Sequence, residues 1–193
     1  MTWPFGALAP LSFDLLMVDP PWAFALRSTK GETKSPQAQY ACMSLDEIKA
    51  LPVAQLARGD ALLWLWATHP MLPQALDVMA AWGFTFSTSG VWVKTTCTGK
   101  LHFGTGYVLR SASEPFLIGR VGRPRTARTV RTVIQAPVRE HSRKPDEAYA
   151  AAEVLAIDAA RRADLFSRET RPGWTAWGAE AGRFDTPFTV AVE

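Results

Sequence analysis

The chain has 193 residues, of which 48% are hydrophobic and 20% charged, with a formal net charge of +3. This length suffices for one sizeable core and is short for two ordinary domains, so we expect a single domain over residues 1–193. No apolar run approaches a membrane span, the first residues lack a signal-peptide pattern, and the cysteines and histidines are dispersed, so we expect a cytoplasmic protein without membrane, disulfide or metal.

The first predicted element is an apolar strand, Phe13–Val18, which is followed directly by Asp19, Pro20, Pro21 and Trp22. A continuous apolar run is typical of a strand buried on both faces, and ligands bind beyond the carboxyl ends of such strands. The Asp19 carboxylate and the Pro20 carbonyl are acceptors, while neither proline offers an N–H group. The tetrapeptide therefore suits an exocyclic aromatic amine, with Trp22 as a stacking face. An ordinary Asp-Pro turn is the alternative.

The rest of the chain alternates strands and helices, which predicts a doubly wound α/β fold. Ser44 and Glu47 form a capping box, so a helix should begin at residue 45 and end near residue 50. The polar stretch 31–39 has no periodicity and is a candidate lid. Further strands are expected at 61–66, 84–86, 91–94, 114–119, 132–135, 162–167 and 174–177, and helices at 70–83 and 145–157. No Gly-x-Gly-x-x-Gly follows a strand, so dinucleotide binding has no support.

Residues 120–131 are rich in arginine, and no acidic residue occurs from 121 to 139. The five residues are Arg120, Arg123, Arg125, Arg128 and Arg131. Arginines along a loop that contains Gly122 and Pro124 predict a phosphate-contacting arm, with Arg123, Arg125 and Arg128 as candidate substrate-binding residues. A solvated surface loop is the alternative.

Several further motifs follow the tetrapeptide in a fixed order. They are residues 40–48 (YACMSLDEI), 63–68 (LWLWAT), 92–95 (WVKT), 104–107 (GTGY), Glu114, 141–147 (HSRKPDE), 172–174 (PGW) and 177–178 (WG). Together they resemble the family of the messenger-RNA adenosine-N6 methyltransferase catalytic subunit, over nearly the whole chain. The resemblance implies an α/β, Rossmann-like class I methyltransferase sheet with a circularly permuted motif order, and S-adenosylmethionine as cofactor.

The resemblance also implies roles for single residues. Asp19, Pro20, Pro21 and Trp22 would be catalytic, with Asp19 also facing the cofactor. Tyr40 and Glu114 would lie beside the adenosine. Asp164 would hold the cofactor ribose within Asp164-Leu165-Phe166, and Lys144 would contact the methionine part. Two departures weaken the cofactor assignments: Asp164 is shorter than the glutamate often found there, and Ala179 lacks an amide.

We therefore expect methyl transfer from S-adenosylmethionine to the N6 amine of adenine in nucleic acid. The compact form resembles bacterial or phage enzymes, which favours DNA over RNA and places the protein in the cytoplasm of a bacterial or phage host cell. An RNA adenine-N6 methyltransferase and a catalytically silent nucleic-acid-binding subunit are the alternatives. No recognition module is evident, so selectivity should come from loops, a second copy in a homodimer, or a partner subunit.

Overall fold

The computed structural model describes residues 2–23, 42–106, 108–140 and 143–185. The strands are β1 (Phe13–Val18), β2 (Ala57–Trp66), β3 (Thr85–Thr95), β4 (Ser113–Val121), β5 (Val133–Pro137), β6 (Arg162–Leu165) and β7 (Trp174–Trp177). The α-helices are α1 (Leu45–Ala50), α2 (Leu72–Ala81) and α3 (Asp146–Leu155), and short 3-10 turns cover Val53–Leu56 and His69–Met71.

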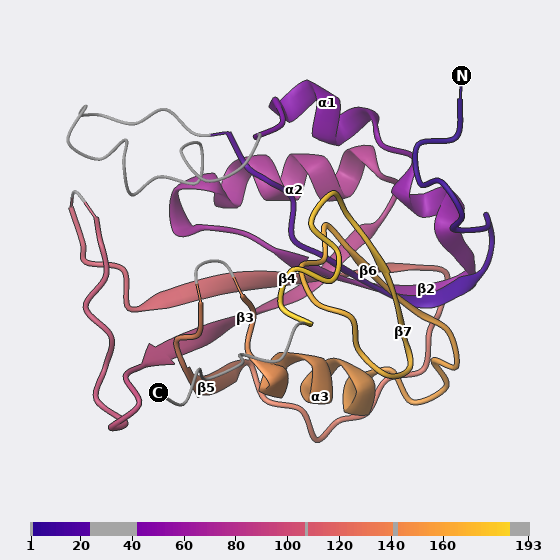
Figure 1. The fold of residues 1–193 in the computed structure, drawn as a ribbon. Coiled ribbons are helices and arrows are strands. Elements are labelled where there is room, and N and C mark those ends of the chain that lie inside the picture. The colour runs from indigo at the N-terminus through magenta and orange to yellow at the C-terminus, as the bar shows by residue number, and fades with distance from the viewer. Residues whose placement is uncertain (1, 24–41, 107, 141–142, 186–193) are drawn as a thin grey trace, which may run out of the picture.

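The seven strands form one sheet in the order β5-β3-β4-β2-β1-β6-β7. Every neighbouring pair is parallel except the two pairs that include β4, so β4 alone among the described strands runs against the rest. The amino end of β4 therefore lies at the same edge of the sheet as the carboxyl ends of the other strands. We call this edge the carboxyl edge; it lies at the left in Figure 1.

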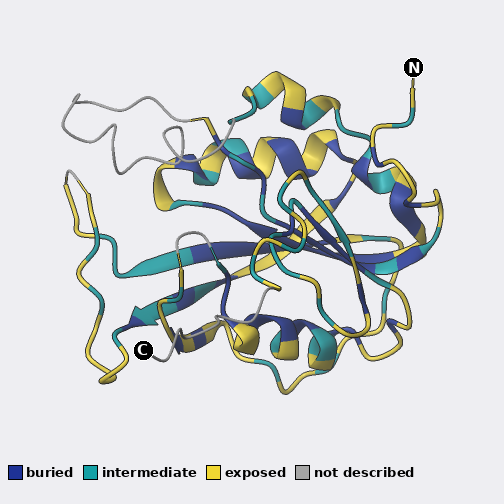
Figure 2. Cartoon of the chain, viewed as in Figure 1, coloured by how far each residue is buried: buried dark blue, intermediate teal, exposed yellow. Residues whose placement is uncertain are grey.

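Helices cover both faces of the sheet: α1 and α2 lie on one face and α3 on the other (Figure 1). Side chains of a strand point alternately to opposite faces, and both faces of β1 are buried. Leu16 and Val18 pack in the core under α1 and α2, while Leu15 and Met17 pack in the core under α3. Figure 2 shows the centre of the sheet and the facing sides of the helices as buried. The expectation of a strand buried on both faces is thus confirmed.

The predicted elements match the structure closely, and the α/β, Rossmann-like sheet is confirmed. The capping box is also present, with Ser44 accepting from the Glu47 N–H. The permuted motif order stays a prediction, and the candidate lid at 31–39 lies outside the described residues. Within the described ranges, no helix has both the length and the apolar character needed to cross a membrane.

One difference concerns β3, which was expected as two short strands and is continuous. Gly90 explains the continuity, because a Cβ atom there would lie 2.2 Å from Phe116 Cζ and 2.6 Å from the Thr132 carbonyl oxygen. Glycine thus lets β3 pass closely between β4 and the chain entering β5, although it interrupts the β-branched and aromatic pattern that predicts a strand. The two stretches expected as separate strands are therefore parts of one strand.

Candidate active site

Four charged side chains come together at the carboxyl edge. Asp19 follows β1, Glu114 is the second residue of β4, Lys94 lies one residue before the end of β3, and Lys144 comes shortly before α3. Glu114 reaches this edge only because β4 runs against the other strands. Residues far apart in the sequence therefore meet at one place.

These side chains form an alternating row of charges. The Lys144 ammonium lies 2.7 Å from Asp19 Oδ2 and 2.8 Å from Glu114 Oε1. Lys94 Nζ lies 2.7 Å from the other Glu114 oxygen, Oε2. The Lys144 side chain is only 8% exposed, while Asp19 keeps 27% of its side chain exposed. Lys144 also lies 5.3 Å from the centre of the Trp66 ring, which adds a cation–π contact. We call Lys94, Glu114, Lys144 and Asp19 the charge row.

Burial and pairing act against each other in the charge row. Burial would raise the pKa of Glu114, but Lys144 and Lys94 outweigh it and lower this pKa to about 2. Burial disfavours the Lys144 charge, yet Asp19 and Glu114 raise its pKa above the ordinary value. Burial raises the pKa of Asp19, an effect that Lys144 opposes and Glu114 reinforces. Of the two carboxylates in the row, Asp19 is the more exposed, and its ionised form is the less stabilised by neighbouring charges.

The backbone around Asp19 is fixed by hydrogen bonds. The Asp19 N–H donates to the Leu165 carbonyl at 3.3 Å, and the Trp22 N–H donates to the Pro20 carbonyl at 2.8 Å. The Met43 N–H donates to the Pro21 carbonyl at 3.0 Å. A carbonyl oxygen has two lone pairs, so Pro20 can still accept one further hydrogen bond.

Trp22 differs from the expectation of a stacking face. It is 5% exposed, belongs to the core under α1 and α2, and donates its indole N–H to the Trp66 carbonyl at 3.2 Å. The ring is therefore a buried support for the Asp19 turn, and a base would have little of it to stack on. Tyr40, the other expected stacking residue, lies outside the described residues.

A cavity opens beside the charge row at the carboxyl end of β6. Asp164, in β6, is 4% exposed and accepts hydrogen bonds from Tyr149 Oη at 2.8 Å and Ser167 Oγ at 2.9 Å. The cavity is lined by Asp19, Trp66, Arg143, Lys144, Tyr149, Asp164, Phe166, Ser167, Arg168 and Glu169. The structure thus brings together Asp19, Lys144, Asp164 and Phe166, which the sequence assigned to one cofactor site.

The turn that closes this cavity has an unusual backbone. Phe166 has φ of 63°, which side-chain-bearing residues rarely adopt. Gly178, after β7, approaches this turn so closely that a Cβ atom would lie 2.9 Å from the Ser167 carbonyl oxygen and 3.0 Å from Phe166 Cα. Leu165 is fully buried behind the turn. Strained backbone of this kind concentrates at ligand-binding sites.

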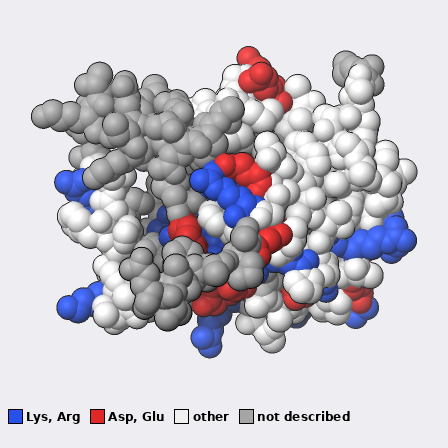
Figure 3. Space-filling view, viewed as in Figure 1, with Lys and Arg blue, Asp and Glu red and all other residues white. Residues whose placement is uncertain are grey.

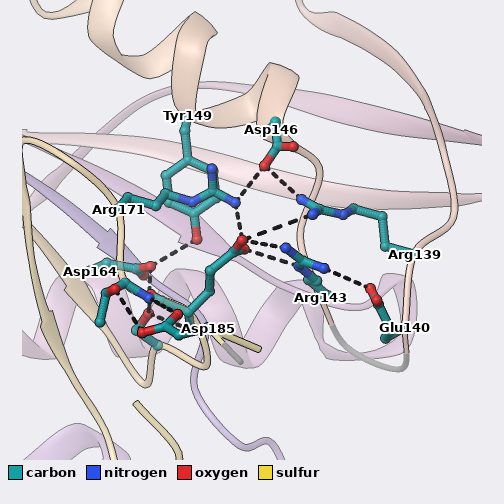
Figure 4. Close-up of polar contacts among 11 residues, drawn as sticks. Arg139, Glu140, Arg143, Asp146, Tyr149, Asp164, Arg171 and Asp185 are labelled. Carbon is teal, nitrogen blue, oxygen red and sulfur yellow. Dashed lines mark hydrogen bonds and ion pairs between the residues drawn. The ribbon is translucent and has the colours of Figure 1, made fainter. Parts of the chain in front are cut away.

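Sequence reasoning missed a network of arginines and acids next to the cavity (Figure 4). Arg143 and Arg171 pair with Glu169, and Arg139 and Arg171 pair with Asp146 at 2.6 Å. The network balances most of its own charge, and Figure 3 likewise shows basic and acidic side chains next to one another near the centre of this face. The signal that could have pointed to it is the acidic Glu169 between Arg168 and Arg171.

The structure does not bring the arginine stretch to the charge row. Because β4 ends at Val121, the following loop lies at the opposite edge of the sheet from Asp19. Arg123, Arg125 and Arg128 are exposed there, and Arg125 pairs with Asp158 at 3.1 Å. In the described part of the chain, no group of three His, Cys, Asp or Glu side chains could hold a metal ion.

The sheet has one reversed strand and carries the Asp19 turn at its carboxyl edge. These two features define a Rossmann-like methyltransferase fold. The chain belongs to the MT-A70 family, whose sequence profile matches residues 13–180. It is 34% identical over 176 residues to an N(6)-adenosine-methyltransferase MT-A70-like protein of Arabidopsis thaliana, covering 86% of this chain and 23% of the relative.

Two further relatives differ in how much of their own length is matched. The type II methyltransferase M.MunI of Mycoplasma sp is 28% identical over 91% of this chain and 81% of its own length. The N6-methyladenosine RNA methyltransferase MTA1 of Cryphonectria parasitica is 29% identical over 95% of this chain and 55% of its own length. The chain spans about a quarter of the length of the plant relatives.

The charge row predicts a pH dependence of stability. The lowered pKa of Glu114 means that its pairing stabilises the fold above its ordinary value of 4.5, and this contribution is lost as the pH falls toward about 2. In urea unfolding at a series of pH values, the wild type should lose unfolding free energy in this window more steeply than Glu114→Gln. The exposed Glu147→Gln is the control and should follow the wild type. Parallel curves for all three proteins would contradict the buried pairing.

Proposed function

We propose that the chain is an S-adenosylmethionine-dependent adenine-N6 methyltransferase that acts on DNA. The observation that carries the proposal is the Asp19 turn: a half-buried carboxylate at the rim of a cavity, followed directly by a carbonyl with a free lone pair, with no donor from either proline. The family membership of the chain and the printed names of its relatives support the same reaction.

In this proposal, Asp19 and the Pro20 carbonyl accept the two hydrogens of the adenine amine. The amine lone pair is otherwise delocalised into the ring, and two fixed acceptors turn the amine toward tetrahedral geometry. The Asp19 carboxylate also stabilises the positive charge that develops on the amine nitrogen. Lys144 holds Asp19 in place at 2.7 Å. Glu114 pairs with Lys144 and keeps the ammonium charged. In this proposal Glu114 also lies beside the bound adenosine.

The cavity fits S-adenosylmethionine by its donor set. Asp164 offers a buried carboxylate for the two ribose hydroxyls, and the Phe166 turn beside it is held by close packing against Gly178. Lys144 and Arg143 line the same cavity and would suit the methionine carboxylate. When bound, S-adenosylmethionine supplies a methyl group made electrophilic by its sulfonium.

DNA is the proposed substrate because the local sequences at residues 66–76 and 104–111 resemble those of bacterial and phage DNA enzymes. The match to M.MunI supports this choice, since it extends over 81% of that type II methyltransferase. A base inside a duplex must be flipped out before its amine can reach Asp19. A methyl-transfer assay on unmethylated duplex DNA, single-stranded DNA and RNA, read by nucleoside mass spectrometry, should give N6-methyldeoxyadenosine. Product only from RNA would replace DNA as the substrate, and no product would contradict the proposal.

Asp19→Ala should abolish methyl transfer while leaving S-adenosylmethionine binding nearly unchanged. The carboxylate acts on the amine, whereas the ribose acceptor Asp164 stays in place. Turnover and calorimetric affinity measure the two effects separately. Asp77→Ala removes a surface carboxylate that is 65% exposed and is the matched control. Substantial turnover by Asp19→Ala would remove Asp19 from the reaction.

The arginine loop is proposed as a second, phosphate-contacting region, reached only by a nucleic acid that extends past the carboxyl edge. Arg123→Gln with Arg128→Gln should then weaken binding of a long duplex equally for all sequences and lower the salt slope by about two units. Methylation of a short single strand should be unchanged. If long-duplex affinity and its salt slope also stay unchanged, the loop is a solvated surface.

A further inference from the structure

The carboxyl group of Asp164 is held by two hydroxyls that meet at one oxygen. Tyr149 Oη, from α3, lies 2.8 Å from Asp164 Oδ2, and Ser167 Oγ, two residues after β6, lies 2.9 Å from the same atom. Figure 4 shows Tyr149 pointing toward Asp164. Both donors thus come from outside the strand that carries Asp164.

Tyr149 is itself fixed in place. The Arg171 guanidinium lies 3.8 Å from the centre of its ring, and Trp174 packs edge-on at 5.3 Å. Arg171 is held in turn by Asp146 at 2.6 Å and Glu169 at 2.7 Å. The arginine network therefore fixes the hydroxyl that reaches Asp164.

The single hydroxyl hydrogen of Ser167 faces two acceptors. Ser167 Oγ lies 2.9 Å from Asp164 Oδ2 and 2.6 Å from the Glu169 carbonyl oxygen. With Asp164 ionised, Ser167 can donate to only one of them. With a proton on Asp164 Oδ2, the carboxyl donates to Ser167, and Ser167 donates to the Glu169 carbonyl. The hydrogen bonds around Ser167 are complete only in the protonated state.

Burial and the neighbouring groups act on the pKa of Asp164 in both directions. The pKa of Asp164 is raised to about 7, mainly by burial and also by the nearby carboxylate of Asp19, after β1. The hydrogen bond from Tyr149, the one from Ser167 where it donates to the ionised carboxylate, and the positive charge of Arg171 before β7 oppose this rise. The other charged groups of the cavity are Arg143, Lys144, Arg168 and Glu169.

We infer that Tyr149 and Ser167 are positioning residues for Asp164, that Ser167 accepts the hydrogen bond of its protonated carboxyl when the cavity is empty, and that a bound ribose diol displaces this proton. The inference rests on the proposed cofactor site. The two hydroxyls of a ribose are donors, so an ionised carboxylate accepts both, whereas a protonated carboxyl sets its own donor against them. Binding therefore selects the ionised form, and the proton leaves to solvent.

Proton release can be measured by titration calorimetry in buffers of different ionisation enthalpy. S-adenosylmethionine binding should release about one proton per site well below pH 7 and almost none well above it, with affinity falling about tenfold per pH unit on the acid side. Because the amino group of S-adenosylmethionine titrates, the second probe is 5′-methylthioadenosine, which keeps the ribose and lacks that group. Both probes should show the same midpoint.

Two conservative variants test the positioning role. Tyr149→Phe removes a donor to the ionised carboxylate, so it should move the affinity midpoint to higher pH. Ser167→Ala removes the acceptor of the Asp164 proton, so it should move the midpoint to lower pH. Ser12→Ala is the matched control, because its hydroxyl donates to the Pro10 carbonyl at the other edge of the sheet. A purely structural role would lower affinity equally at every pH and leave the midpoint in place.

Binding of both probes without proton release, or an unmoved midpoint in Tyr149→Phe and Ser167→Ala, would overturn the inference and leave the methyltransferase proposal intact. Failure of the folded wild type to bind S-adenosylmethionine at all would overturn the cofactor site, and the inference with it. Thermal unfolding followed by circular dichroism shows that each variant compared is folded.

Discussion

The site depends on one buried ammonium. Lys144 is placed between Asp19 and Glu114, at 2.7 and 2.8 Å, with its side chain almost fully buried. Without it, two carboxylates would face each other in a poorly solvated place and one of them would take up a proton. Lys94 behind Glu114 completes a neutral set of two cations and two anions. The arrangement allows a carboxylate to stand at the rim of a cavity ready to accept from an amine.

The pairing of Glu114 with Lys144 depends on the reversed direction of β4. It delivers Glu114 to the carboxyl edge and sends the arginine loop to the opposite edge. The same edge carries two distinct polar systems: the charge row, which faces the proposed amine, and the hydroxyls around Asp164, which face the proposed ribose. Asp19 couples them electrostatically, since its charge also acts on Asp164.

Much of this could be predicted from sequence because local patterns carried it. The apolar run before Asp19 predicts a buried strand with a loop at its carboxyl end, and the capping box predicts α1. Properties set by distant packing could not be predicted in this way. Nothing near Trp22 indicates that its ring enters the core, and the positions of Arg123 and Arg128 depend on the direction of β4, which a strand pattern does not encode. The pairing of Lys144 with Asp19 joins residues 125 positions apart, beyond any local signal.

The most direct test of the charge row is a carboxyl-carbon NMR titration of wild type and Lys144→Met, with Glu114→Gln used to assign the Glu114 signal. The row predicts that Glu114 titrates near pH 2 in the wild type, and that Lys144→Met raises the pKa of both Glu114 and Asp19. Unchanged titration of both carboxyls in the Lys144→Met protein would contradict the account, because it would mean that Lys144 does not hold the carboxylate proposed to receive the amine.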